Sequence, residues 1–219
     1  MEQDDLSRLW ARLWQNWRFR PIFVIGLVLA AIGALKLIGL GPTPVPAPAQ
    51  IPSDYATPAA LQELQQAADT GDADAQFLLA SLYRDGDGVA SDPAKAFELA
   101  VKSAGQGNAN GEWLLGVLYK NGEGTESNME LAAQNFEAAA EQGDPWSQAM
   151  LGGFYMNGTG VTQDKANAYK WLSLAASQGN AAAKSFLSVV KDTFTPEEID
   201  EGARGAQSIR EKIGSLDEE

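Results

Sequence analysis

The sequence predicts an all-α fold: an α/α solenoid of about three helix-pair repeats of 36 residues with terminal capping helices, preceded by one transmembrane helix. Two observations predict this architecture. Residues of the same type recur every 36 positions through most of the chain, and a run of 19 residues near the N-terminus is apolar except for Lys36. A fixed period of this size is typical of stacked supersecondary units, and such a run is typical of a membrane span.

The 36-residue period is carried by leucine, tyrosine, glycine and alanine positions. The recurring sets are Leu79, Leu115 and Leu151; Tyr83, Tyr119 and Tyr155; Gly86, Gly122 and Gly158; Gly88, Gly124 and Gly160; and Ala104, Ala140 and Ala176. Each period predicts a first helix, a glycine-rich loop and a second helix, here named helix A and helix B. The expected A helices span 73–84, 109–120 and 145–156, and the expected B helices span 92–106, 128–142 and 164–178. The first glycine of each loop suits the left-handed position that ends a helix.

Both ends of the solenoid are predicted to be capped. Residues 59–72 read as a lone B helix, and residues 181–191 read as a fourth A helix. Thr195 and Glu198 form a capping box with Pro196 at the first helical position, which predicts a final helix to about residue 213. The solenoid with its cap therefore covers 59–213, and residues 214–219 form an acidic tail.

The N-terminal part divides into three segments. Residues 1–20 form an amphipathic segment with tryptophans on one face and arginines on the other, residues 21–41 the transmembrane helix, and residues 42–58 a proline-rich linker. Four arginines precede the apolar run at 22–40, and no basic residue follows it before Arg84. The positive-inside rule then places the N-terminus in the cytoplasm and the repeats across the membrane, which in a bacterium is the periplasm.

Two alternatives remain for this part of the chain. A cleavable signal peptide would use the A-x-A-like site at residues 47–49, although the 21 residues before the apolar run and the length of the run favour an uncleaved anchor. The segment 1–20 is either a topological anchor lying in the headgroup layer or a docking helix for another membrane subunit.

Composition excludes several kinds of chemistry. The chain has no cysteine and no histidine, so disulfides, thiol catalysis, Ser–His pairs and the usual zinc ligands are absent. From residue 41 onward there are 11 basic and 26 acidic residues, a net charge of −15, which disfavours binding to nucleic acid. The glycine loops are too short for a calcium-binding loop and follow helices rather than strands. We therefore expect no catalytic residues, no metal, no cofactor and no small-molecule substrate.

The pattern L-G-x-x-Y-x-x-G-x-G-V, followed by K-A-x-x-W and A-A-x-x-G, resembles the Sel-1-like repeat family, a tetratricopeptide-related α/α solenoid. The third repeat resembles it most, with Leu151-Gly152, Tyr155, Gly158, Gly160-Val161, Asp164-Lys165-Ala166, Trp171, Ala175-Ala176 and Gly179. The second repeat departs from it at Asn135 and Thr125, and the first at Ala80 and Leu99. The resemblance covers residues 59–192 and implies an adaptor or scaffold that binds other proteins. Some cysteine-rich relatives are described as binding or hydrolysing β-lactams, but this chain lacks their cysteines.

These features predict a non-enzymatic adaptor in the bacterial inner membrane whose periplasmic repeats bind a protein of the cell envelope. The alternatives are an accessory subunit docked through residues 1–41 and, less favoured, a carboxylate-dependent hydrolase. A helices usually line the concave face of such solenoids, where aromatic anchors flanked by acids would concentrate binding energy. The expected partner-binding residues are Asp74, Phe77, Glu112, Trp113, Val117 and Trp146. Their rings could equally serve packing between repeats.

Overall fold

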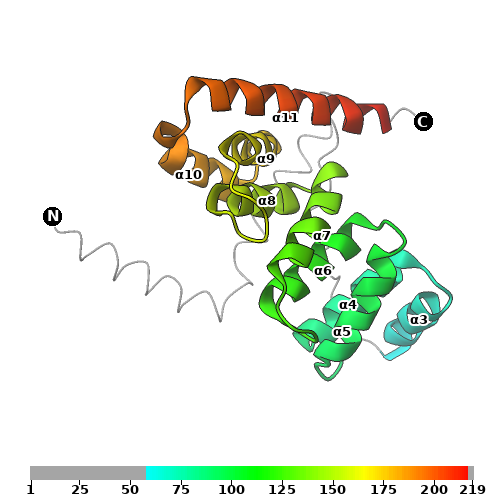
Figure 1. Ribbon diagram of the computed structural model, residues 1–219. Helices are drawn as coiled ribbons and strands as arrows, with labels where there is room; N and C mark the ends of the chain where they lie inside the picture. The colour runs from blue at the N-terminus through cyan, green and yellow to red at the C-terminus, as the bar shows by residue number, and fades with distance from the viewer. Residues whose placement is uncertain (1–57, 217–219) are drawn as a thin grey trace. The chain divides into compact units, whose positions relative to one another are not determined.

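The computed structural model describes residues 58–216, which form nine α-helices and one short 3-10 helix (Figure 1). The predicted segments 1–20 and 21–41 and the linker up to residue 57 lie outside the described residues. No helix within 58–216 is long and apolar enough to cross a bilayer. The elements are α3 (Pro58–Asp69), α4 (Ala73–Asp85), α5 (Pro93–Ala104), α6 (Ala109–Asn121), α7 (Met129–Glu141), α8 (Pro145–Asn157), α9 (Lys165–Ser177), α10 (Ala181–Val190), η2 (Lys191–Thr193) and α11 (Pro196–Leu216).

The helix boundaries follow from residues that recur at the period of the repeat. The A helices are α4, α6, α8 and α10, and the B helices of the complete repeats are α5, α7 and α9. Each of these seven helices begins after an Asp or Asn whose side chain accepts a hydrogen bond from the backbone N–H three residues on. Gly86, Gly122 and Gly158 end α4, α6 and α8 in the left-handed conformation, as predicted. These caps satisfy backbone groups that a helix end leaves unpaired.

The core lies between the A and B helices of each repeat and between each B helix and the next A helix. The leucines of the repeat signature, Leu79, Leu115 and Leu151, are buried, whereas Tyr83, Tyr119 and Tyr155 are only half-buried. Glycine lets helices approach closely where the facing residue is large. A methyl group on Gly116 would lie 2.8 Å from the Phe136 ring, and one on Gly152 would lie 2.6 Å from Leu172 Cγ.

The glycine loops of the second and third repeats also pack on the preceding repeat. A Cβ atom on Gly124 would lie 2.0 Å from the carbonyl oxygen of Pro93, and one on Gly160 would lie 2.0 Å from that of Met129. Both glycines have positive φ. Glycine is therefore required at this loop position twice over, for the left-handed backbone and for the close approach to the start of helix B.

The last helix, α11, packs on α9 rather than beside α10 (Figure 1). Its capping box is present: Glu198 Oε2 accepts from the Thr195 backbone N–H at 2.8 Å, and the Glu198 N–H donates to Thr195 Oγ1 at 3.2 Å. Gly202 lies against Ala166 and Tyr169 of α9, and Ala206 joins the core of the third repeat. Lys212 forms an ion pair of 2.8 Å with Glu141 at the end of α7. The cap thus spans the second and third repeats.

Candidate protein-interaction surface

The candidate surface is the face of α4, α6 and α8 formed by three helical positions in each repeat. These positions are Asp74, Phe77 and Ser81 on α4; Asn110, Trp113 and Val117 on α6; and Trp146, Ala149 and Gly153 on α8. The 36-residue register places them in equivalent positions, so any difference in their exposure comes from the side chains and from the neighbouring repeats.

On α4 only Asp74 of this face is exposed. Phe77 is 2% exposed and lies in the core between the first and second repeats with Leu114 and Leu115, so its ring does not reach the surface. Ser81 is also buried and donates to the Phe77 carbonyl at 3.1 Å. The expected row of three aromatic side chains is therefore reduced to Trp113 and Trp146.

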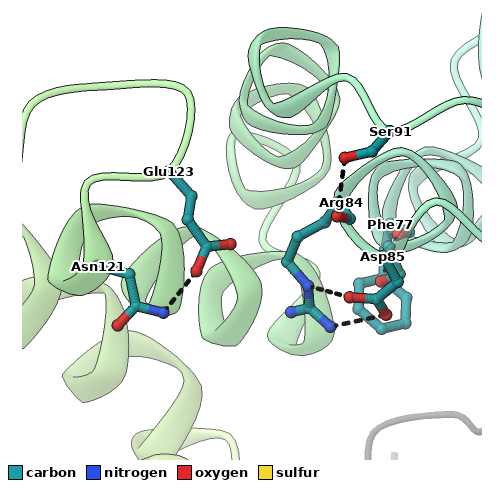
Figure 2. A network of polar contacts seen from close by, with 7 residues as sticks. Phe77, Arg84, Asp85, Ser91, Asn121 and Glu123 are labelled. Carbon is teal, nitrogen blue, oxygen red and sulfur yellow. Dashed lines mark hydrogen bonds and ion pairs between the residues drawn. The ribbon is translucent and has the colours of Figure 1, made fainter. Parts of the chain in front are cut away.

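On α6 the face is half-buried. Trp113 contacts the cores on both sides of the second repeat, and Val117 packs against the core of the third. The Arg84 guanidinium carbon lies 6.0 Å from the Trp113 ring centroid, within the range of a cation–π contact. Arg84 is held by two hydrogen bonds of 2.8 and 3.0 Å to Asp85, while Ser91 donates to its carbonyl (Figure 2). Trp113 thus combines inter-repeat packing with a partly accessible edge.

On α8 the face is open. Trp146 is 43% exposed, and a side chain built at Gly153 would meet no atom within 4 Å. Ala149, between them, is half-buried against the core of α9 and α10. Asp144 caps this helix by accepting from the Ser147 backbone N–H at 2.6 Å, and burial raises the pKa of its carboxyl group. The open part of the candidate surface therefore centres on Trp146 and Gly153.

The two predicted acids bond to amide groups of a neighbouring turn. Asp74 Oδ1 accepts from Asn108 Nδ2 at 2.6 Å, and Glu112 Oε2 accepts from Gln142 Nε2 at 2.7 Å. The Glu112 bond belongs to a series that sequence reasoning missed. Gln106 donates to Gln76 and Gln178 donates to Gln148 at the equivalent positions, each across 30 residues. The recurrence of these glutamines every 36 residues in the sequence could have predicted this series of hydrogen bonds.

Glu112 is the one carboxylate at its position in this series. Gln76 and Gln148 each also donate to a backbone carbonyl, of Ala68 and Ala140 respectively, at 3.1 Å. An ionised Glu112 has no proton to donate in this way. Partial burial raises the pKa of Glu112, and the bond from Gln142 opposes that rise without cancelling it. The charged form of this side chain is therefore less favourable in the folded protein than in water.

Replacing Glu112 with glutamine should stabilise the domain by about 0.5–1.5 kcal/mol at neutral pH, the net value of one hydrogen bond. Because the folded-state pKa is raised, the stability contributed by Glu112 is complete below its unfolded pKa and is lost as pH rises through the folded value. The gain should therefore be small in acid and grow as the pH rises through the titration of Glu112. Thermal unfolding of both proteins across this pH range measures it, and an equal difference at every pH would contradict the account.

The described part of the chain shows no cluster of side chains for metal binding. Between residues 58 and 216 no group of three or more acidic, histidine or cysteine side chains is arranged to hold a metal ion. The half-buried charged groups near the third repeat, including Lys170, pack against α11 instead of lining a cavity. What the arrangement provides is an extended surface of helices with one open, aromatic segment.

Stacked helix pairs with glycine loops and an open A-helix face define a helical repeat protein of the α/α solenoid class. The Sel1 repeat model matches residues 73–108, 109–144 and 147–180. The chain is also similar to the crystal structure of a Sel1 repeat protein from Oxalobacter formigenes, with 37% identity and a TM-score of 0.54 over 58% of this chain and 96% of that one. The chain belongs to the Sel1 repeat family, whose members generally mediate protein–protein interactions.

A second similar structure is c5321, a protective antigen of uropathogenic Escherichia coli strains that displays the same repeat fold. It is 24% identical, with a TM-score of 0.53, and the match covers 70% of this chain and 41% of that one. This likeness concerns the fold alone. A comparison with curated proteins finds no match.

Proposed function

We propose that this protein is a non-enzymatic adaptor that binds a protein partner through the A-helix face of its second and third repeats. The observation that carries the proposal is the open face of α8, where Trp146 is 43% exposed and a side chain at Gly153 would meet no atom within 4 Å. Large aromatic side chains, tryptophan above all, are enriched among interface hot spots. Trp113 and Val117 extend this face onto α6, and the exposed Asp74 and half-buried Glu112 supply acidic groups at its edge.

The Gly153→Arg variant should abolish partner binding and leave the fold intact. The arginine would stand on the open face of α8, and exchanging a helical glycine for a good helix former should raise stability by up to about 1 kcal/mol. Cross-linking and capture from cells that carry the full chain would measure partner binding, and thermal unfolding would measure stability. The matched control is Gly214→Arg on α11, where a side chain also meets no atom within 4 Å. Capture by the Gly153 variant at the level of this control would exclude the face.

We further propose that the repeats lie in the bacterial periplasm, tethered to the inner membrane by residues 22–40. The proposal rests on the apolar run, on the four arginines that precede it and on the absence of basic residues between it and Arg84. The proline-rich segment that follows would hold the repeats away from the bilayer. The partner is then a protein of the cell envelope.

A reporter enzyme that folds only outside the cytoplasm, fused after Glu219, should be active, and the fusion should remain in the membrane fraction. Activity of a cytoplasm-specific reporter at the same position would reverse the orientation. A soluble mature form that begins near residue 50 would instead identify a signal peptide.

A second candidate function is favoured by the tryptophan stripe of residues 1–20. Trp10, Trp14 and Trp17 recur at helical spacing, which would also suit docking of this chain as an accessory subunit of a membrane complex. Deleting residues 1–20 separates the two functions. The deletion should abolish assembly of an accessory subunit, whereas an adaptor that works through α6 and α8 should still capture its partner.

A further inference from the structure

The described solenoid begins and ends with half of a repeat. By the 36-residue register, α3 is a B helix and α10 is an A helix, and they lie at opposite ends of the stack (Figure 1). The residues at the place of the A helix before α3 are 37–49, which join the end of the predicted transmembrane helix to a stretch with four prolines. Within residues 58–216 the chain therefore presents a B helix without its A helix at one end and an A helix without its B helix at the other.

The helix that follows α10 does not fill the missing B position. In register, α11 would place Arg204, Ser208 and Glu211 where α9 buries Ala168, Leu172 and Ala175. Polar and charged side chains cannot occupy these buried positions without partners. The helix instead uses a stripe through Gly202 and Ala206 to pack on α9.

The exposure of α10 shows the resulting gap. Val189 is 77% exposed, the most of the exposed large hydrophobic side chains in the described chain. Leu187 and Val190 are only half-buried, although the equivalent residues of the three complete repeats are all buried. Ser188 is exposed at the position where Gly116 and Gly152 contact their B helices.

The other end has a matching gap. Ala67 of α3 is half-buried, whereas its equivalents Ser103, Ala139 and Ala175 are completely buried. Glu63 is exposed at the position where α9 buries Trp171. These are the differences expected for a B helix that lacks its A helix.

The two ends also differ in charge. The only charged side chains of α3 are the acids Glu63 and Asp69, whereas α10 carries Lys184 alone and η2 after it carries Lys191 and Asp192. The asymmetry extends beyond the end helices. Residues 58–144 contain 15 acidic and 4 basic residues, a net charge of −11, while residues 145–216 contain seven of each. Opposite charges on surfaces that would meet favour association and fix its orientation.

We propose that two copies of this chain stack head to tail, with α3 of one copy against α10 of the other, so that the two half-repeats form one complete repeat across the interface. In such a contact Ser188 faces the position of Leu64, as Gly152 faces Leu172 within the chain. The interface is heterologous, so it extends into a short row of copies unless the rotation closes a ring. This association leaves the open face of α8 free and is independent of the partner proposed above.

The absence of cysteine from the chain allows a direct test by single-cysteine cross-linking. Full-length Glu63→Cys and Ser188→Cys proteins, both altered at exposed positions, should form a cross-linked dimer with a short bismaleimide when mixed. Neither protein should do so alone. The control replaces Ser188→Cys with Val101→Cys, since Val101 is an exposed apolar residue on α5, away from either end. The proposal is wrong if the test mixture gives no more cross-linked dimer than this control mixture. It is also wrong if Ser188→Cys cross-links with itself as well as it does with Glu63→Cys, because that result indicates a two-fold contact.

A second variant separates association from folding. Adding Val189→Asp to the Ser188→Cys protein should abolish the cross-link, because it places an acid opposite Glu63 and Asp69. The melting temperature should stay unchanged, because Val189 is 77% exposed. Persistence of the cross-link in this variant would also overturn the proposal.

Discussion

The Trp171→Ala variant should lose about 3–5 kcal/mol of unfolding free energy, the range measured for truncation of large aromatic residues in protein cores. Trp171 is completely buried and belongs to the cluster that joins α7, α8, α9 and α11 through Phe136, Leu151 and Ala206. Its removal leaves a cavity at the junction of four helices. Because the surrounding side chains are closely packed, this cavity cannot collapse fully. Denaturant unfolding followed by circular dichroism measures the loss.

Trp146→Ala is the matched control for this variant. Trp146 is also a tryptophan and lies on α8, the helix before α9, but it is 43% exposed. Its truncation should therefore change the unfolding free energy by less than about 0.5 kcal/mol. Similar losses for the two variants would contradict the difference in burial between the two rings.

Gly160→Ala should be the most damaging of the small substitutions. Glycine at this position has a φ of +66°, and the left-handed conformation costs other residues about 1–2 kcal/mol. The added methyl group would also lie 2.0 Å from the Met129 carbonyl oxygen, so the loop must move away from α7. Overpacking of this kind adds about 1–3 kcal/mol. Thermal and denaturant unfolding should therefore show the sum of the two costs.

Gly107→Ala isolates the first of these costs. Its φ is +75°, but a side chain there meets no atom within 4 Å. This variant should lose only the strain of the left-handed backbone. If both variants lose the same stability, the loop of the third repeat does not press on the preceding repeat as described.

The repeated elements of the fold could be predicted because each is specified by residues that lie close in sequence. The N-cap Asp92 with Pro93, the terminal Gly122 and the capping box at Thr195 each set a helix end locally. The recurrence of these signals every 36 residues then fixed the register of the stack. The family followed from the same residues.

The features that the sequence did not reveal depend on contacts between repeats. Phe77 and Trp146 both lie on the A-helix face, yet Phe77 is buried because the second repeat covers it, while the face of α8 stays open at Trp146 and Gly153. The direction of α11 was equally hidden. The Thr195 capping box fixes where the helix begins but does not decide whether it packs on α9 or beside α10.

The cap formed by α11 gives the two ends of the solenoid different mechanical properties. Ala206 and the Lys212–Glu141 ion pair tie the third repeat to the second, so α7, α8 and α9 resist separation together. Among the described residues, the first repeat has only α3 on its outer side. Any pulling force transmitted through residues 1–57 acts first on α3, at the end that α11 does not contact. Under such a load we expect the first repeat to unfold before the face of α6 and α8 that we propose to bind the partner.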